Sequence, residues 1–388
     1  MKFDRLFDLT PQKVTRSLSW RAKNLQPSLR ALWRWRGQQP RVYLHNAHTP
    51  HPVFRTYITH PPLRYAPYPI AQLCHWVDMM PAMRFLDKPH IFEIEHPFIF
   101  SRSNDGWRFV SDWFLVLENR EWMSELLARE QCRSVFTFSQ GLVEHSKAYL
   151  EPCVWHKLDF VYPAFPVQPI KARSENKAFT ILIIASRWSD KGLPEALKTF
   201  VILRARHGER VRLDLVTQAM PPGTTLPDGV SHYDVPQLSP ELKERLYRGA
   251  DVLFLPCLSE TAACFTEAYA FGVPVVTTRI HHGDEFVREG QTGFLLQAPL
   301  FPYSPDFGTK WRTAEDFMAD LETRRARGDL NVVVDEAVER LDAMICGDVD
   351  MDAMRVAARS FHAERFSPRA RNKKLRAIYA RALGSEEA

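Results

Sequence analysis

The sequence predicts an α/β protein with two Rossmann-like domains, each built on a parallel sheet. Strand-like apolar runs alternate with helical patterns along most of the 388 residues, as parallel sheets require. A stretch with three prolines and no periodicity, residues 163–177, separates two such series. The chain is also long enough to bury two cores. We expect a basic arm (1–40), a first domain (41–165), a linker (166–178), a second domain (179–365) and a C-terminal helix (366–388) that packs back toward the first domain.

The first domain is predicted from short runs rich in β-branched and aromatic residues. These strand-like runs are Arg41–His45, Phe54–Ile58, Ile91–Glu95 and Val135–Phe138. Helical patterns are found at Ile70–Leu86, Asn119–Glu130 and Gln140–Leu150. Because helices lie between successive strands, the strands are expected to run parallel.

The second domain is predicted from a denser series of the same kind. Its strands are expected at Phe179–Ala185, Val211–Val216, Asp251–Pro256 and Val273–Thr278. Pro194 suits the first turn of a helix after the first of these strands. A further helix is expected at Phe265–Phe271, where Gly272 ends it, and a helical tail covers Thr313–Leu383.

Charged residues gather where the strands of the second domain end. Arg187 and Lys191 follow its first strand, whereas Glu260 and Glu267 follow its third. Ligands bind beyond the carboxyl ends of parallel strands, so these side chains are expected at one ligand-binding edge. A guanidinium, an ammonium and the start of a helix suit a diphosphate. The alternatives are an exposed surface pair for the two cations and a carboxylate stabilised by the helix dipole for Glu267.

Motifs of several other ligand classes are missing. No G-x-G-x-x-G follows a strand and no G-x-x-x-x-G-K-[ST] occurs, so neither a dinucleotide fingerprint nor a Walker loop is predicted. The six cysteines contain no C-x-x-C pair, which suits reduced thiols and argues against a zinc site. The N-terminus lacks the apolar core of a secretory signal, so a cytoplasmic protein is expected.

Residues 1–40 carry the basic excess of the chain. They contain nine Lys and Arg side chains against two Asp, whereas the whole chain has a net charge of +5. The basic side chains are interleaved with Leu25, Leu29, Leu32, Trp33 and Trp35, a pattern that suits an interfacial helix on an anionic membrane. The alternative is a solvated helix whose apolar side packs on the domain. No nucleic-acid-binding motif accompanies the charge, so nucleic acid is not an expected partner.

The second domain, at about Phe179–Leu296, resembles retaining GT-B glycosyltransferases of the family 4 type, the glycosyl transferases group 1. The motifs that carry the resemblance are R-x-x-x-K-G at Arg187–Gly192, the strand Asp251–Pro256, E-A-x-A-x-G-V-P-V-V at Glu267–Val276 and D-E-x-V-x-x-G-x-T-G-x-L at Asp284–Leu295. Members usually place seven residues between two glutamates. Here six lie between Glu260 and Glu267, and Ser259 stands at the strict spacing.

The resemblance is weaker in the first domain. His96, after the strand Ile91–Glu95, stands where the family carries a histidine facing the cleft. The glycine-rich acceptor loop of many relatives is not visible at Arg41–Pro52. The acceptor side is therefore expected to be atypical.

The resemblance implies a GT-B fold, with two Rossmann-like domains facing a cleft, and a role for each matched residue. Arg187 and Lys191 would stabilise the diphosphate, and Glu267 would bind the ribose hydroxyls. Asp284 and Glu285 would bind sugar hydroxyls or cap a turn. The implied catalytic residues are Glu260, His96, Arg187 and Lys191, and the implied donor-binding residues are Arg187, Lys191, Glu267, Glu260, Ala262 and Ala263.

No metal and no cofactor is expected. Transferases that depend on a divalent cation usually show a D-x-D pair, because hard cations take carboxylate ligands. Acids one residue apart occur at Glu93–Glu95, at Asp320–Glu322 and in the run Asp348–Asp352. None lies at the expected donor edge, and the last run suits helix-capping aspartates. With Arg187 and Lys191 available for the diphosphate, the site is predicted to be metal-independent.

The sequence thus predicts a hexosyltransferase that takes a nucleotide-sugar donor and retains anomeric configuration. A glycan or lipid-linked acceptor of polysaccharide biosynthesis is the expected partner. One alternative is a non-catalytic sugar- or nucleotide-binding subunit of the same fold. Another is a membrane-surface scaffold built around residues 1–40, at the inner face of the membrane.

Overall fold

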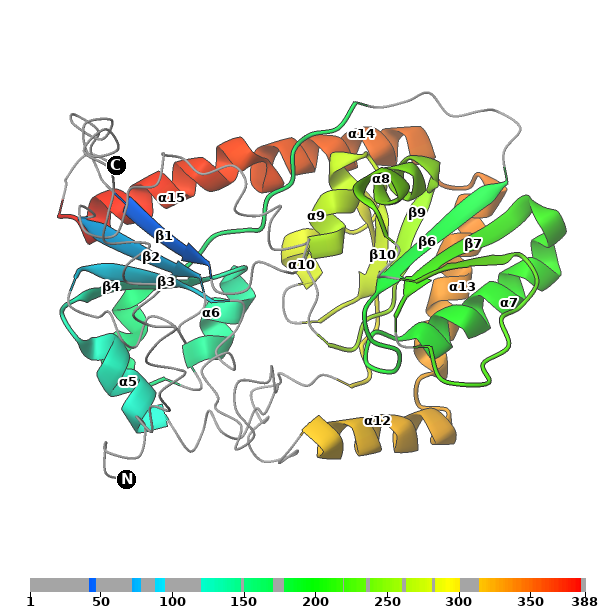
Figure 1. The fold of residues 1–388 in the computed structure, drawn as a ribbon. Coiled ribbons are helices and arrows are strands. Elements are labelled where there is room, and N and C mark those ends of the chain that lie inside the picture. The colour runs from blue at the N-terminus through cyan, green and yellow to red at the C-terminus, as the bar shows by residue number, and fades with distance from the viewer. Residues whose placement is uncertain are drawn as a thin grey trace.

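The computed structural model describes residues 42–46, 72–77, 88–94, 120–147, 150–169, 178–218, 220–234, 238–259, 263–280, 283–300 and 314–384 (Figure 1). They form two parallel sheets with helices packed on them. One sheet has five strands in the order β1-β2-β3-β4-β5, and the other has six in the order β11-β10-β9-β6-β7-β8. The predicted fold class, two parallel-sheet α/β domains, is confirmed.

The five-stranded sheet belongs to the first half of the chain. Its strands are β1 (Val42–Asn46), β2 (Leu73–Val77), β3 (His90–Glu93), β4 (Cys132–Thr137) and β5 (Leu158–Phe160). Helices α5 (Arg120–Ala128) and α6 (Gln140–Lys147) and the 3-10 helix η5 (Pro152–Lys157) accompany them. Ile91 and Phe92 on β3 and Val135 and Phe136 on β4 are fully buried, so the core lies along these middle strands.

The helix expected over Ile70–Leu86 is wrong, because Leu73–Val77 forms strand β2. This strand pairs with β1 on one side and with β3 on the other. A short apolar run fits a buried strand as well as a helix, so its two partners in the sheet decide the outcome. The strand expected at Phe54–Ile58 lies outside the described residues.

The six-stranded sheet forms the second half. Its strands are β6 (Phe179–Ala185), β7 (Val211–Thr217), β8 (Val230–Tyr233), β9 (Val252–Leu255), β10 (Val275–Thr278) and β11 (Gly293–Leu296). Its helices include α7 (Leu193–His207), the 3-10 turn η6 (Gly208–Arg210), α8 (Pro240–Gly249), α9 (Ala263–Ala270), α10 (Gly283–Phe286), α12 (Ala314–Arg327) and α13 (Asn331–Cys346). Ile181, Leu182 and Ile183 on β6 are buried at its centre.

The order of the strands reverses beside β6. The chain runs outward from β6 through β7 to β8, returns to β9 on the other side of β6 and continues through β10 to β11. Such a reversal leaves a crevice at the carboxyl ends of the two strands that flank it, which is where doubly wound sheets bind ligands. The fold therefore predicts a ligand site among the residues that follow β6 and β9.

The end of the chain contacts both domains. Helix α14 (Met351–Phe361) packs on α9, a π-helical turn η8 (His362–Phe366) follows, and α15 (Pro368–Ala382) runs along the five-stranded sheet (Figure 1). The Ser367 hydroxyl caps α15 by accepting the Ala370 N–H at 3.2 Å. Leu375, Ile378 and Tyr379 of α15 are buried against that sheet.

A buried polar network fixes α15 on the five-stranded sheet. Arg371 of α15 pairs with Glu93 at the end of β3. Glu93 also lies 3.0 Å from His75 Nε2, and His75 Nδ1 lies 2.9 Å from the Tyr379 hydroxyl. Burial raises the pKa of Glu93, but Arg371 and His75 outweigh it and hold this pKa at about 2. The first domain is thus completed by residues almost three hundred positions away.

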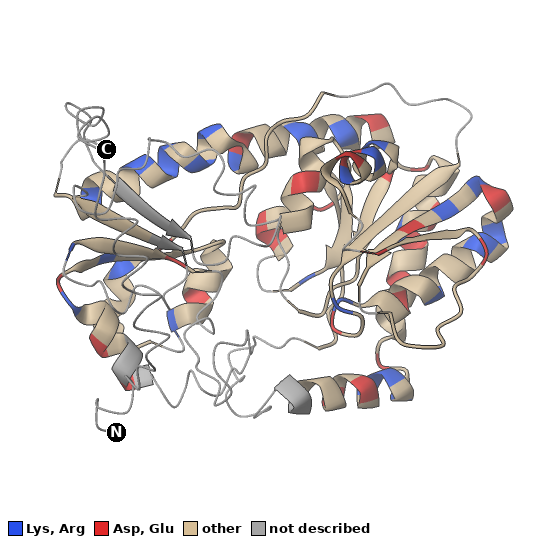
Figure 2. Ribbon diagram, in the orientation of Figure 1, with Lys and Arg blue, Asp and Glu red and all other residues tan. Residues whose placement is uncertain are grey.

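The basic character of α15 is visible in Figure 2. The helix carries six Lys and Arg side chains and no Asp or Glu. Lys374 lies 2.9 Å from Asp159 on β5, and Arg381 also pairs with this carboxylate. The helix therefore attaches to the first sheet by charge as well as by apolar contact. None of the described helices is long and apolar enough to cross a membrane.

The chain passes from the first domain to the second near Phe165 and returns near Phe366, and these two connecting segments lie together. The Phe165 N–H donates to the Phe366 carbonyl of η8 at 3.0 Å. Three residues further on, the Gln168 N–H donates to the Ala270 carbonyl of the second domain at 3.1 Å. The Tyr162 ring packs edge-on against Phe366 at 5.3 Å between ring centroids. The outward and return crossings are thus held side by side.

Candidate functional site

A short loop leads from β6 into α7 at the strand reversal. Gly192, its last residue, has a φ of 71°. A Cβ atom added to Gly192 would fall 2.0 Å from the carbonyl oxygen of Pro256, which follows β9. Only glycine combines this backbone conformation with so close an approach at little cost. The loop is therefore held against the end of β9.

Two hydrogen bonds orient Arg187 in this loop. Its Nε donates to Asp190 Oδ2 at 2.7 Å, and its Nη2 donates to Ser259 Oγ at 3.1 Å. The Ser259 hydroxyl in turn donates to Asp190 Oδ2 at 2.7 Å. Because Ser259 follows β9, this triad ties together the two strand ends at the crevice.

Asp190 is a residue that the sequence prediction missed. It is only 6% exposed. Burial raises the pKa of its carboxyl, but Arg187, Lys191 and hydrogen bonds outweigh burial and hold this pKa below its usual range. Asp190 is therefore ionised at neutral pH and orients the Arg187 side chain, which is 57% exposed. Its position between the Arg and the Lys of the R-x-x-x-K-G motif was the signal in the sequence that could have identified Asp190 as a site residue.

Lys191 and the start of α7 complete this part of the site. Lys191 is buried and stands two residues before the helix, whose first turn contains Pro194 as predicted. The N–H groups of Gly192 and Leu193 donate within the loop, so this helix N-terminus contributes mainly the positive end of the helix dipole. The structure thus brings Arg187, Lys191 and a helix N-terminus to the carboxyl end of β6, a combination suited to an anion.

Glu267 lies on α9 and faces α8. Its carboxylate accepts a hydrogen bond from Tyr247 Oη at 2.9 Å and pairs with Lys243 Nζ at 2.5 Å. With 2% exposure, Glu267 is part of a buried ion pair. A carboxylate has about four lone-pair positions, so two contacts leave acceptor capacity for a ligand. Ribose binding by Glu267 stays a prediction.

Three predicted site residues, His96, Glu260 and Ala262, lie outside the described residues. Ala263 is described and opens α9, where it is partly buried. The structure therefore gives the position of the diphosphate-binding candidates and of Ala263. The roles of all the predicted site residues stay predictions.

Glu285 joins the two domains. It lies on α10 of the second domain and accepts the backbone N–H groups of Gln140 at 2.8 Å and Gly141 at 2.5 Å, at the N-terminus of α6. The Tyr162 hydroxyl also donates to it at 2.8 Å. Its carboxylate thus caps a helix of the first domain instead of a turn of its own. Asp284, beside it, pairs with Arg279.

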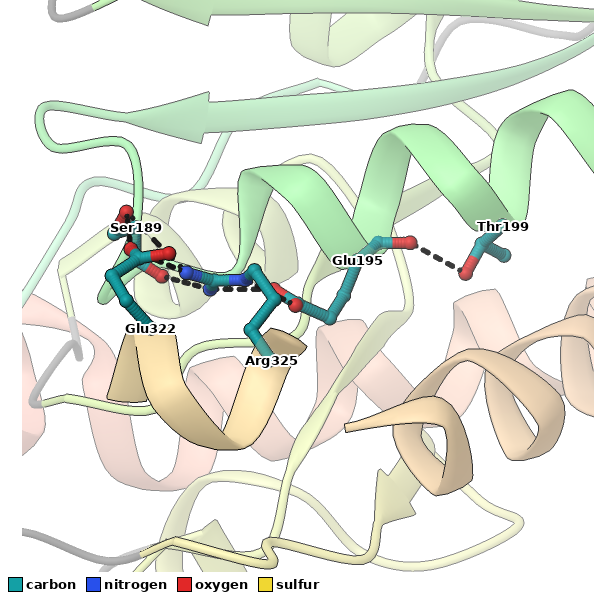
Figure 3. A network of polar contacts seen from close by, with 5 residues as sticks. All are labelled: Ser189, Glu195, Thr199, Glu322 and Arg325. Carbon is teal, nitrogen blue, oxygen red and sulfur yellow. Dashed lines mark hydrogen bonds and ion pairs between the residues drawn. The ribbon is translucent and has the colours of Figure 1, made fainter. Parts of the chain in front are cut away.

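A second network supports the loop from below (Figure 3). Arg325 of α12 donates from Nε and Nη2 to the two carboxylate oxygens of buried Glu195, at 2.7 and 3.0 Å. Its Nη2 also donates to the Ser189 carbonyl at 3.0 Å, and its Nη1 donates to Glu322 at 2.6 Å. The Ser189 hydroxyl donates to Glu322 at 2.5 Å. Helix α12 thereby holds Ser189, which lies between Arg187 and Lys191.

Each acidic group considered as a metal site contains a residue with a structural partner. Glu93 belongs to the network of α15, and Glu322 contacts Ser189 and Arg325. Asp350 accepts the Ala353 N–H at 2.9 Å as the N-cap of α14, so the expected capping role is confirmed for this residue. Independence of the reaction from metal stays a prediction.

Two parallel-sheet α/β domains and a C-terminal helix shared between them define the GT-B fold. Solved structures agree: a glycosyltransferase from Rickettsia africae has a TM-score of 0.52 at 13% identity, with 89% of this chain and 85% of that one covered. Anabaena HepE in complex with UDP-glucose has a TM-score of 0.51 at 12% identity, with 80% and 78% covered.

Sequence comparison places the nearer likeness in the second domain. Residues 178–300 match the family model described as glycosyl transferases group 1. The D-inositol 3-phosphate glycosyltransferase of Paenarthrobacter aurescens is 35% identical over 107 residues, which is 27% of this chain. The match spans only 24% of the length of this curated relative. The matched model includes the loop after β6, the residues after β9 and helices α9 and α10.

Proposed function

We propose that the protein is a glycosyltransferase that moves a hexosyl group from a nucleotide sugar to a glycan or lipid-linked acceptor. The observation that carries this proposal is the Arg187 guanidinium, oriented by Asp190 and Ser259 beside Lys191 and the N-terminus of α7. The match of residues 178–300 to a glycosyltransferase model supports it. So does Anabaena HepE, a protein of the same fold in complex with UDP-glucose.

The chemistry gives these cations a task. Cleavage of the bond between the anomeric carbon and the diphosphate places negative charge on the leaving group and positive charge on the sugar ring. Arg187, Lys191 and the helix dipole would stabilise the leaving diphosphate. Since these groups supply positive charge where other transferases use a divalent cation, transfer would need no metal.

The proposed reaction retains anomeric configuration. The acceptor hydroxyl would approach on the side of the leaving group, and the departing diphosphate would take its proton. Glu260 and the backbone at Ala262 and Ala263 would face the sugar ring, while His96 would contribute from the first domain. No dedicated protein base is needed in this scheme, so His96→Ala would slow the reaction without abolishing it.

A second candidate is a sugar- or nucleotide-binding subunit without catalysis. The observation that favours it is the buried ion pair of Glu267 with Lys243, which occupies part of the carboxylate proposed to bind ribose. Such a subunit would hold a nucleotide at the same loop after β6. It would transfer no sugar.

We also propose that residues 1–40 contact an anionic membrane from its cytoplasmic side. The nine basic side chains among leucines and tryptophans support this proposal. Flotation with anionic liposomes should recover the full chain and leave behind a chain that lacks residues 1–40. Equal recovery of both chains would contradict the proposal.

Two measurements on the purified full chain separate the glycosyltransferase from the non-catalytic binding subunit. The first is a thermal-shift screen with UDP, ADP and GDP, in which stabilisation by one of them reports nucleotide binding. The second is release of nucleoside diphosphate from α-linked nucleotide sugars without divalent metal. Binding with turnover supports the enzyme, and binding without turnover supports the subunit. Absence of binding contradicts both, and a β-linked product in proton NMR contradicts retention.

A further inference from the structure

A cluster of side chains of the types that bind metals lies far from the loop after β6. His207 is the last residue of α7, whereas the loop with Arg187 and Lys191 lies at the first. A 15-residue helix is about 22 Å long, so the cluster is at the opposite side of the domain. His207 faces α13, which supplies Asp342 and Cys346. None of these residues has a role in the function proposed above.

The three donors converge at one point. His207 Nε2 lies 2.6 Å from Asp342 Oδ1. One ligand atom each of His207, Asp342 and Cys346 falls within 4.8 Å of the other two. Asp342 and Cys346 are four residues apart on one helix, so both project from the same face of α13. The histidine side chain is only 9% exposed, whereas Cys346 is exposed and accessible to an entering ion.

The three ligand atoms, a nitrogen, an oxygen and a sulfur, indicate which kind of metal ion fits the cluster. Zinc binds imidazole nitrogen, carboxylate oxygen and thiolate sulfur at about 2.0 to 2.3 Å, so ligand atoms in a tetrahedral site lie about 3 to 4 Å apart. The three atoms lie within 4.8 Å of one another, so small side-chain rotations would bring them into this range. Magnesium and calcium prefer sites made wholly of oxygen, so a site with sulfur and nitrogen disfavours them.

The surroundings favour a cation. Beside the cluster lies an open hollow of about 470 Å³, lined by the carboxylates of Asp335, Glu339, Asp342 and Asp348 and by Arg206. The acids outnumber the single Arg in this lining. Arg206 Nη1 approaches Asp342 Oδ2 at 3.5 Å, which leaves the other oxygen, Oδ1, directed at His207. Arg206 can therefore hold the carboxylate while Oδ1 binds a metal, as partners of ligating carboxylates do.

We propose that His207, Asp342 and Cys346 form a binding site for zinc or a similar borderline divalent ion, with water as the fourth ligand. The ion takes the place of the hydrogen bond between His207 and Asp342, and binding releases the thiol proton of Cys346. It links the end of α7 to the end of α13. The absence of a C-x-x-C pair hid this site in the sequence, because its ligands come from helices more than 130 residues apart.

The test uses the full chain after treatment with a chelator. Titration with Co²⁺ should give one equivalent of tetrahedral cobalt with a thiolate-to-cobalt charge-transfer band in the near ultraviolet. Zn²⁺ should displace the cobalt and raise the Tm. Cys346→Ser should abolish the band. Asp342→Asn should weaken zinc affinity at least about tenfold, since removal of a group that only hydrogen-bonds a metal ligand already has that effect.

Cys153→Ser is the matched control, because Cys153 is another exposed cysteine and lies in the first domain. This variant should bind cobalt and zinc as the unaltered chain does. The proposal is wrong if the unaltered chain takes up no metal. It is equally wrong if Cys346→Ser keeps the charge-transfer band, or if Cys153→Ser loses it. None of these outcomes depends on glycosyltransferase activity.

Discussion

The two sheets use charged side chains in different ways. In the five-stranded sheet one ion pair is buried: Glu93 and Arg371 are each less than 5% exposed and hold α15 in place. At the edge of the six-stranded sheet Asp190 is buried, but its partner Arg187 is more than half exposed. One pair therefore serves stability, whereas the other, under the proposed function, would present a cation to a ligand. Substitutions in the two pairs should affect different measurements.

The largest effect is expected in the first pair. Arg371→Ala leaves the Glu93 carboxyl buried without its guanidinium partner, so the free energy of unfolding should fall by about 3 to 5 kcal/mol. Urea denaturation measures this loss. Lys373→Ala, an exposed position on the same helix, should change stability by less than about 0.5 kcal/mol. Equal effects of the two substitutions would show that the buried pair has no special role.

Acid should weaken the same pair. The pKa of Glu93 is lowered from its usual 4.5 to about 2 in the folded protein. A carboxyl whose pKa is lowered by folding stabilises the protein at pH values above its usual pKa. This stabilisation is lost as pH falls from about 4.5 toward 2. The difference in stability between the unaltered chain and Arg371→Ala should therefore shrink over this range. A difference that is constant from pH 6 to pH 2 would contradict this account.

The second pair should show the reverse pattern. Under the proposed function, Arg187→Ala should lower kcat about a hundredfold, the usual cost of losing one stabilising donor. The free energy of unfolding should change by less than about 1 kcal/mol, because Arg187 is largely exposed and buried Asp190 keeps Lys191 and the Ser259 hydroxyl beside it. Transfer rates and urea denaturation on the same preparation measure both. Lys198→Ala, exposed on α7, is the control and should change neither. A loss of stability without a loss of rate would reverse the comparison.

Arg325 is intermediate between these two pairs, because its side chain is mostly covered, at 11% exposure, yet contacts the loop after β6. Arg325→Met should weaken nucleotide binding about tenfold, or about 1.4 kcal/mol, by releasing Ser189. Amide hydrogen exchange of residues 186–192 should rise even without nucleotide, and Arg325→Lys should partly restore protection. Arg324→Met, which removes the neighbouring pair with Asp320, is the control. Unchanged exchange in Arg325→Met would exclude support of the loop.

The smallest effect is expected where the domains meet. Glu285→Gln keeps the shape of the side chain but removes the negative charge at the N-terminus of α6. The free energy of unfolding should fall by about 0.5 to 1 kcal/mol. Asp284→Asn, which affects only an exposed pair with Arg279, should have almost no effect. Thermal denaturation of both variants in parallel makes the comparison, and an equal response would remove Glu285 as a link between domains.

The sequence predicted the second domain more accurately than the first. The strand Phe179–Ala185 was predicted to the residue, because an uninterrupted apolar run at the centre of a parallel sheet has few alternatives. Leu73–Val77 was assigned to a helix, since its strand character depends on β1 and β3 on either side. Local sequence patterns are sufficient to predict a strand that is buried throughout. They fail where pairing with distant strands decides between helix and strand.

The same reason explains which site residues were missed. Arg187 and Lys191 belong to one short motif and could be found by reading along the chain. Asp190 lies inside that motif, but its role depends on Ser259, which is 69 positions away. Arg325 and the cluster around His207 depend on contacts between helices 130 or more positions apart. A single sequence carries no record of such contacts.

The meeting of the two chain crossings has a mechanical consequence. The hydrogen bond from Phe165 to Phe366 places two covalent connections side by side, with the ring of Tyr162 against the second. A single connecting segment between two domains permits rotation about any axis. Two connecting segments held next to each other permit bending about the line that joins them and resist torsion. Whatever movement the domains make, Arg187 and the first domain should therefore approach or separate along one arc.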